Sequence, residues 1–432
     1  MKKLVTIIAF IGIAFYSYAQ DVDKLIKQDD VERIIKTLSA DDMQGRATFT
    51  PGIEKAAQFI EAEYKNIGLV PMAGNTGYRQ NFTMIKTEPV KAEVSINGTV
   101  ISAENVGVIS GSAFSWNKTE DAEIIRVAPS DDLQKIFMSA MRSSKSTLVL
   151  LDPQFASIFQ RVRGRAVGGG VAFKDSPDKK QLVFVLGKFD DIKSLAVNYE
   201  VKSRELPLFN IAGIIPGKTK PDEFVVFSGH YDHLGIVKPV GQDSIANGAD
   251  DDASGTTAVI SLAKYYKKLN NNARTLIFVA FTAEEIGEYG SQYFATTVNP
   301  DKVTAMFNIE MIGKASKWGQ NSAFITGFER SDFGTILQKN LEGTAFKFYP
   351  DPYPDQNLFY RSDNASLAKV GVPAHTISTD QIDIDKLYHT VKDEFSSLDV
   401  ANITSAIRAI ALSSRTIVAG TDTPKRVPKL EQ

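Results

Sequence analysis

The sequence predicts an α/β protein: a mixed, largely parallel, twisted sheet sandwiched by helices, with a smaller strand-rich unit inserted. From about residue 208 onward, the apolar runs EFVVFSG, TLIFVAF and VTAMFNI are separated by helical segments such as SGTTAVISLAKYYKKL. Uninterrupted β-branched and aromatic runs of this kind are typical of strands buried on both faces. Between about residues 91 and 202, short runs such as STLVLLD and QLVFVLG alternate with polar loops. This change of texture indicates the insertion.

The first 19 residues have the pattern of a secretory signal peptide. A basic start, MKK, precedes the apolar run LVTIIAFIGIAF and the small-x-small sequence SYA. The apolar run is short for a membrane span, although an uncleaved anchor is the alternative. We therefore expect an exported protein, periplasmic or secreted, with no membrane span after cleavage.

Charge and cysteine content restrict the partners and the metal ligands. Removal of the two leader lysines changes the net charge from −2 to about −4, which argues against nucleic acid. The chain has no cysteine, so it has no disulfides, and any metal ion must be bound by histidine and carboxylate.

The division of the chain follows from these segments. Residues 20–90 form an N-terminal helical part of the main domain, residues 91–202 the inserted unit, and residues 203–432 the rest of the main domain. Apolar residues at helical spacing predict an amphipathic helix over residues 53–67, with Gly68 as its C-terminal cap. The glycine-rich RGRAVGGGVAF lacks a following Lys-Ser/Thr, so we interpret it as a bend rather than a phosphate loop.

Polar residues follow the predicted strands at the edge where α/β proteins place their sites. These residues are His230 after the first strand, Glu284 and Glu285 after the second, Glu310 after the third, and His389 in a late loop. Three adjacent acids, Asp250 to Asp252, lie just before a helix, where backbone N–H groups favour negative charge.

Histidines and carboxylates in these numbers suit a pair of divalent cations. A carboxylate that bridges two cations about 3.5–4 Å apart explains an acid where packing does not favour one, and we choose Asp251 for this role. Asp250 and Asp252 would cap the helix or fix nearby loops. The alternatives are a solvated turn or a calcium loop, and the latter is disfavoured because the twelfth position from Asp250 is Ser261.

Five motifs together resemble the M28 family of co-catalytic zinc peptidases, which includes bacterial leucyl aminopeptidases. They are SGHYDHLG, NGADDDASG, FTAEEIGEYGS, NIEMIG and LYHTVKDE, in that order, and DDMQGRATFTPGIEKAAQFIEAEYKNIGL resembles the N-terminal region of secreted members. The match spans nearly all of the mature chain except the inserted unit, which would be a lid similar to a protease-associated domain.

The resemblance implies a role for each residue. One zinc ion would bind His230 and Glu310, the second would bind Glu285 and His389, and Asp251 would bridge them. Glu284 would be the general base for a metal-bound hydroxide. Asp232 would accept the second ring N–H of His230 and so fix its tautomer.

The chain departs from the family pattern at two positions. Glu310 stands where many members have Asp, which bears on metal choice and on which peptide end is cleaved. Asn364 stands where members often have His. Tyr360 and Arg361 are candidate hydrogen-bond donors to the substrate or the oxyanion, although a packed aromatic and a surface charge are the simpler interpretation. We interpret His233 and His375 as structural, and for His233 in HYDHLG the alternative is a residue that supports the ligands or lines the pocket.

The resemblance therefore implies an exported zinc exopeptidase that acts on peptides, with an aminopeptidase favoured. A carboxypeptidase or dipeptidase of the same family is the alternative. A single-zinc glutaminyl cyclase and a non-catalytic binding module are less favoured, because the whole ligand set is present.

Overall fold

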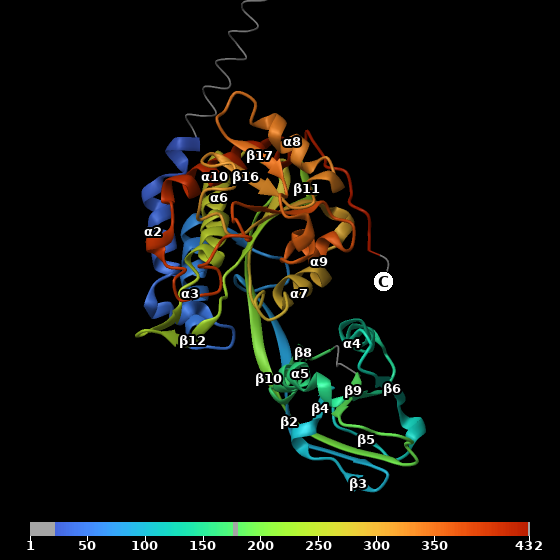
Figure 1. The fold of residues 1–432 in the computed structure, drawn as a ribbon. Coiled ribbons are helices and arrows are strands. Elements are labelled where there is room, and N and C mark those ends of the chain that lie inside the picture. Colours follow the sequence, from blue (N-terminus) through green and yellow to red (C-terminus); the bar gives the residue numbers. More distant parts are fainter. Residues whose placement is uncertain (1–21, 176–179, 431–432) are drawn as a thin grey trace, which may run out of the picture. The chain divides into compact units, whose positions relative to one another are not determined.

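A computed structural model describes residues 22–175 and 180–430 (Figure 1). The chain divides into two compact units, Met1–Asn81 with Phe209–Gln432, and Phe82–Leu208. The predicted insertion, residues 91–202, falls within the second unit, and the predicted signal peptide lies outside the described residues. None of the described helices has both the length and the apolar character that a membrane crossing requires.

The larger unit is built on a mixed, largely parallel sheet, as predicted. Its strands lie in the order β17 (Lys347–Pro350), β16 (Ser322–Ile325), β18 (Ala374–Ser378), β15 (Val303–Ile309), β11 (Lys220–His230), β14 (Arg274–Phe281) and β10 (Leu195–Ile215). β11 pairs in parallel with both β14 and β15, whereas β10 pairs antiparallel with β14, and β16 antiparallel with β18. The three apolar runs chosen from the sequence are therefore β11, β14 and β15.

Helices cover both faces of this sheet. Alternate residues of β11 belong to different cores: Val225 and Phe227 pack on one side, and Val226 on the other. The first core also contains α2 (Gln28–Leu38), α3 (Pro51–Ile67), α6 (Gly255–Leu269) and α10 (Val400–Ser413). The second contains residues of α7 (Tyr289–Thr297) and α9 (Asn364–Ala368). Phe227 stacks on Phe278 and Phe307 of the two neighbouring strands, so aromatic side chains fill this side of the middle of the sheet.

The helix predicted over residues 53–67 is α3, and its predicted cap is confirmed. Gly68 has φ of +79° and donates its N–H to the carbonyls of Tyr64 and Lys65. The predicted apolar face is buried from Ile53 to Tyr64.

The smaller unit contains a four-stranded sheet, β4 (Val106–Ser110), β9 (Gln181–Leu186), β7 (Thr147–Leu151) and β6 (Glu123–Val127). It also contains two helices, α4 (Leu133–Arg142) and α5 (Ala156–Val167). The glycine-rich segment is not one bend: its first part ends α5, and its last part is β8 (Gly170–Phe173). Only the turn at Gly168–Gly169 remains, where a Cβ on Gly169 would lie 2.0 Å from the carbonyl oxygen of Thr87.

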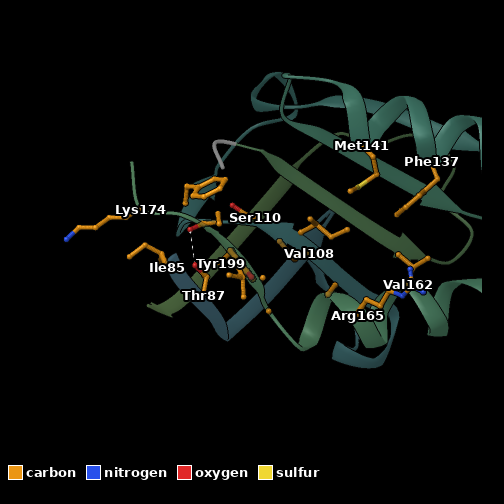
Figure 2. Close-up of a pocket in the computed structure, with 18 residues that line it drawn as sticks. Ile85, Thr87, Val108, Ser110, Phe137, Met141, Val162, Arg165, Lys174 and Tyr199 are labelled. Atoms are coloured by element: carbon orange, nitrogen blue, oxygen red, sulfur yellow. Dashed lines mark hydrogen bonds between the residues drawn. The ribbon is translucent and has the colours of Figure 1, made fainter. Parts of the chain in front are cut away.

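An apolar cavity of about 350 Å³ lies within the smaller unit (Figure 2). Its walls come from β4, α4, α5, β8 and β2 (Arg79–Ile96) and include Val108, Phe137, Met141 and Val162. None of its lining residues is a predicted site residue.

Candidate metal centre

Three strand ends and one loop carry the predicted site residues. His230 is the last residue of β11, and Glu284–Glu285 and Glu310 follow the ends of β14 and β15. The three strands are parallel and in register, with Gly229 opposite Ala280 and Ser228 opposite Asn308, so their carboxyl ends meet at one edge. Asp251 lies in the buried segment Ala249–Ser254 that leads into α6.

Asp251 is the centre of the cluster. Its Oδ1 lies 3.1 Å from Nε2 of His230, and its Oδ2 lies 3.2 Å from Nε2 of His389. Nε2 of His389 also lies 3.1 Å from Oε2 of Glu285. One carboxylate therefore contacts two imidazoles through its two oxygens, as a residue bridging two cations would. Burial raises the pKa of Asp251, but the charges of His233 and His230 and the hydrogen bonds with His230 and His389 outweigh it and hold that pKa well below its usual range.

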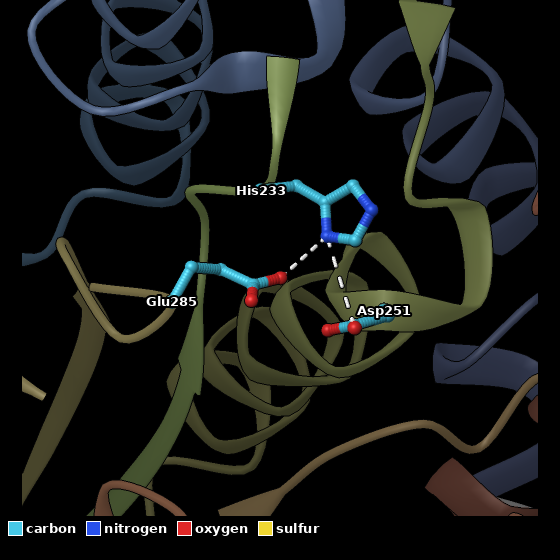
Figure 3. Close-up of side chains that lie close together, drawn as sticks. All are labelled: His233, Asp251 and Glu285. Carbon is cyan, nitrogen blue, oxygen red and sulfur yellow. Dashed lines mark hydrogen bonds and ion pairs between the residues drawn. The ribbon is translucent and has the colours of Figure 1, made fainter. Parts of the chain in front are cut away.

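His233 joins the cluster, although a structural role was the favoured interpretation of it from the sequence. Its Nδ1 lies 2.6 Å from Oε1 of Glu285 and 3.7 Å from Oδ2 of Asp251 (Figure 3). Two ligands of one tetrahedral zinc ion lie about 3.3–3.5 Å apart, because each bond is about 2.0–2.2 Å long. The shorter contact is a hydrogen bond, which leaves Oε2 of Glu285 facing His389. The signal in the sequence was the place of His233 in the HYDHLG motif.

Glu284 and Glu285 are adjacent but differ in environment. The Glu285 carboxylate contacts two histidines, and these contacts hold its pKa below the usual range against burial and the charge of Asp251. Burial raises the pKa of Glu284 well above its usual range, and nearby Glu310 and Asp363 raise it further. Adjacent glutamates can therefore have different roles: one suits metal binding and the other suits proton transfer.

Glu310 is half-buried beside the other acids, and its Oε2 atom is buried. Burial raises its pKa to about 7, with the charges of Asp251 and Glu285 adding to this and His230 and a hydrogen bond with Ser362 opposing it. Its Oε2 has no hydrogen-bond partner among residues 22–175 and 180–430. A buried, unpartnered carboxylate oxygen is costly unless a cation binds it.

Asp232 acts differently from its predicted role. Nδ1 of His230 lies 3.1 Å from the backbone carbonyl of Asp232, and only 3.8 Å from its carboxylate. The carboxylate accepts the backbone N–H groups of Glu284 and Glu285 at 3.1 and 3.3 Å. Asp232 therefore fixes His230 through its main chain and the glutamate turn through its side chain.

Asp250 and Asp252 fix neighbouring loops. Oδ1 of Asp252 accepts the N–H groups of Gly255 and Met311, and Oδ2 accepts that of His230. Oδ1 of Asp250 accepts the N–H of Gly313, and its Oδ2 lies 3.1 Å from Nζ of Lys314.

Asp393 was not identified from the sequence. Its carboxylate accepts the backbone N–H groups of Asp250 and Asp251 at 3.0–3.2 Å. It lies in LYHTVKDE, four residues after His389, and this position in a quoted motif was the only signal.

The remaining candidates separate clearly. Arg361 lines a cavity of about 60 Å³ together with Glu310 and Tyr388. Tyr360 does not line it and instead lies against Phe359 and Arg330. His375 is structural, as predicted. It is buried, its Nε2 lies 2.8 Å from Ser331 Oγ, and its Nδ1 lies 2.8 Å from the Thr326 carbonyl oxygen.

Asn364 contacts its own segment and β18. Its amide group donates to the carbonyls of Phe359 and Ala374, and its oxygen accepts from the Thr376 hydroxyl. It therefore orders the segment around Arg361 without touching the cluster.

The donor set fits zinc. The residues offer imidazole nitrogens and carboxylate oxygens, and their 3.1–3.2 Å separations around Asp251 are close to those of ligands sharing a tetrahedral ion. A surplus of buried carboxylates provides the negative charge for cations. His233, Asp251 and Glu285 also form a compact group of possible ligand atoms.

Comparison with known proteins agrees with this geometry. Residues 210–413, just under half of the chain, match the model described as peptidase family M28. Leucine aminopeptidase 1 of Ajellomyces capsulatus (strain NAm1 / WU24) is 29% identical over 248 residues, 52% of this chain and 62% of that protein. A probable zinc metalloprotease of Leptosphaeria maculans is 33% identical over 141 residues, 31% of this chain and 32% of that protein. The chain thus spans less than two thirds of the length of these curated relatives.

Solved structures confirm the fold. The similarity to an aminopeptidase from Aneurinibacillus sp. strain AM-1 spans 96% of this chain and 97% of that chain, with a TM-score of 0.55 and 17% identity. The similarity to a zinc aminopeptidase from Bacillus subtilis spans 92% of this chain and 97% of that chain, with a TM-score of 0.53 and 15% identity. At these identities the likeness is one of fold.

Proposed function

We propose that the protein is a zinc-dependent exopeptidase, specifically an aminopeptidase, that binds two zinc ions. The observation that carries the proposal is the position of Asp251, whose two carboxylate oxygens contact His230 and His389 separately. The match of residues 210–413 to peptidase family M28 supports hydrolysis of peptide bonds, and the similarity to leucine aminopeptidases supports action at the amino end.

The family resemblance supplies the ligand assignment, and the contacts around Asp251 support it. His230 and Glu310 would hold one zinc ion, Glu285 and His389 the other, and Asp251 both. His233 would donate a hydrogen bond to Oε1 of Glu285 and leave Oε2 for the metal. Ligating carboxylates are commonly held in this way by a second residue.

The chemistry divides between the metal and Glu284. Zinc supplies a Lewis acid and lowers the pKa of an attacking water molecule. Glu284 accepts a proton from that water on its carboxylate and later donates it to the leaving amine. Its raised pKa suits both steps. Asp232 keeps Glu284 in place by accepting its backbone N–H.

Metal analysis and a substrate panel test the proposal. We expect two zinc ions per chain, loss of aminoacyl-anilide hydrolysis on chelation, and recovery with zinc. Peptides blocked at the amino end should resist cleavage, and peptides blocked only at the carboxyl end should be cleaved. The reverse pattern would identify a carboxypeptidase, one zinc ion would favour the cyclase, and activity that survives complete chelation would refute the proposal.

We also propose that residues 1–19 direct export and are removed. Support comes from the basic start and the apolar run of the sequence. Expression with the leader should give an extracytoplasmic protein that begins at Gln20, whereas an intact amino terminus would contradict cleavage.

A further inference from the structure

Arg46 is a fully buried arginine next to the metal cluster, in the N-terminal part of the larger unit. Its guanidinium donates to backbone carbonyls of Tyr231 at 2.9 Å, Asn247 at 2.5 Å and Gly248 at 2.9 Å. It also donates to the carbonyl of Leu38 at 2.7 Å. A fifth contact, to the carbonyl of Asp251, is at the limit at 3.5 Å. Tyr231 lies between His230 and Asp232, and Asn247 and Gly248 lead into Asp251.

The surrounding turn supports the same two loops. The carbonyl of Arg46 accepts the N–H of His233 at 3.3 Å, and the hydroxyl of Thr48 donates to Asp232. Asn247 donates its side-chain amide to the carbonyl of Ser39. Gly45 allows this close approach, because a Cβ there would lie 2.4 Å from the carbonyl of Ala246.

The charge of Arg46 has no direct ion-pair partner in the part of the chain that the structure describes. The carboxylates that act on it through space are those of Asp251, Asp393, Asp232 and Asp252. A buried cation bonded only to carbonyls is costly unless nearby negative charge compensates for it. Here that negative charge belongs to the metal cluster and its supports.

We infer that Arg46 is a positioning residue that preorganises the His230–His233 and Asn247–Asp251 loops before metal binds. Its planar fork contacts both loops at once, and its charge offsets the gathered carboxylates in the metal-free protein. A lysine could supply the charge but not the divergent hydrogen bonds. This inference rests on the proposed zinc site.

Zinc affinity of three full-length variants, measured by competition with a chromophoric chelator, tests the inference. Arg46→Lys should weaken zinc binding by about 10- to 100-fold, the usual effect of removing a residue that supports metal ligands. Arg46→Gln separates geometry from charge, since the loss of a nearby positive charge alone would tighten binding. Arg274→Lys is the matched control, because Arg274 is equally buried but lies at the start of β14, away from the cluster.

Each outcome decides one question. Weaker binding by Arg46→Lys, with Arg274→Lys unchanged, supports the inference. Wild-type zinc affinity in Arg46→Lys overturns the inference. Tighter zinc binding by Arg46→Gln also overturns it, because the charge of Arg46 would then be its main effect. A wild-type protein that binds no zinc refutes the proposed function instead.

Hydrogen exchange of the wild-type protein provides a second test if Arg46→Lys fails to fold. The amides of His233, Asp250 and Asp251 are hydrogen-bonded to Arg46 and Asp393. They should be protected without zinc. Amides that become protected only after zinc is added would mean that the metal, not Arg46, orders the loops.

Discussion

The two ends of the central strands both bury charge, but they satisfy it differently. At the start of β14, Arg274 donates to Glu223, to the carbonyls of Ile417 and Asp422, and to the Thr423 hydroxyl, each at 2.6 Å. At the opposite end, Asp251 and Glu285 pair only with imidazoles in the described residues, and Oε2 of Glu310 has no partner there.

The difference separates a structural charge from a functional one. A buried charge with all its hydrogen bonds made has no free donor or acceptor for a ligand. Its role is structural, because removing one partner destabilises the fold. A buried carboxylate with unpaired oxygens destabilises the metal-free protein, and those oxygens remain available to bind a cation. Burial of a charged group alone therefore does not identify a site. Buried charged groups that lack hydrogen-bond partners do.

The largest effect is expected from Glu284→Gln at the metal end. The amide keeps the shape but cannot accept a proton, so kcat should fall by about 10²- to 10⁴-fold. Zinc content and melting temperature should stay close to wild type, since a neutral side chain replaces a buried acid. Steady-state kinetics with metal analysis measures this, and turnover within twofold of wild type would remove Glu284 from the mechanism.

Arg274→Met tests the opposite end of the strands. Removing the guanidinium leaves two buried carbonyls and Glu223 without their donor, so the free energy of unfolding should fall by about 3 kcal/mol. Zinc affinity should not change. Lys220→Met is the control, because Lys220 pairs with the same glutamate at the surface at 3.4 Å and should cost less than about 1 kcal/mol. A large change in zinc affinity for Arg274→Met would show that the two ends are coupled.

The features that could be predicted from the sequence are those that depend on the side chains of a single segment. Apolar runs located β11, β14 and β15, spacing located α3, and the place of acids after strands located Glu284, Glu285 and Glu310. Each signal is local, because a buried strand or an amphipathic helix shows its environment in its own residues.

Contacts made through the main chain left no such signal. Arg46 binds carbonyls 185 to 202 residues away, and any residue type at those positions offers the same acceptor. The same holds for His230, which contacts the carbonyl of Asp232 rather than the predicted carboxylate. A structural role was favoured for His233 over a supporting one, because a lone histidine gives no indication of the carboxylate that the fold brings to it.

His233→Gln tests whether the short contact to Glu285 belongs to the metal end. Without the imidazole donor, Glu285 should lose its fixed orientation, and zinc affinity should fall by about tenfold. His375→Gln is the matched control, since His375 is equally buried but its ring nitrogens contact Ser331 and Thr326 rather than the cluster. It should reduce stability and leave zinc affinity unchanged. Equal zinc affinity in the two variants would return His233 to a structural role.

A further expected effect is a pH dependence confined to the metal end. Hydrogen bonds with Asp251 and Glu285 outweigh burial and raise the pKa of His389 to about 10, and burial raises that of Glu310 to about 7. Both groups bind protons more tightly in the folded metal-free chain than in the unfolded chain. The stability that protonated His389 contributes is therefore complete below about pH 6.5 and is lost as the pH rises towards 10.

Zinc must displace these protons, so its affinity should rise by about tenfold per pH unit for each proton released between pH 6 and 8. At the other end, Arg274 holds the pKa of Glu223 below its usual range, so Glu223 stays charged throughout this interval. Chelator competition and denaturant unfolding at pH 6, 7 and 8 measure both quantities. The metal-free protein should lose stability over the same interval in which zinc binding gains affinity. A flat zinc affinity would mean that the cluster is already deprotonated without metal, and the proposed contrast between the two ends would no longer hold.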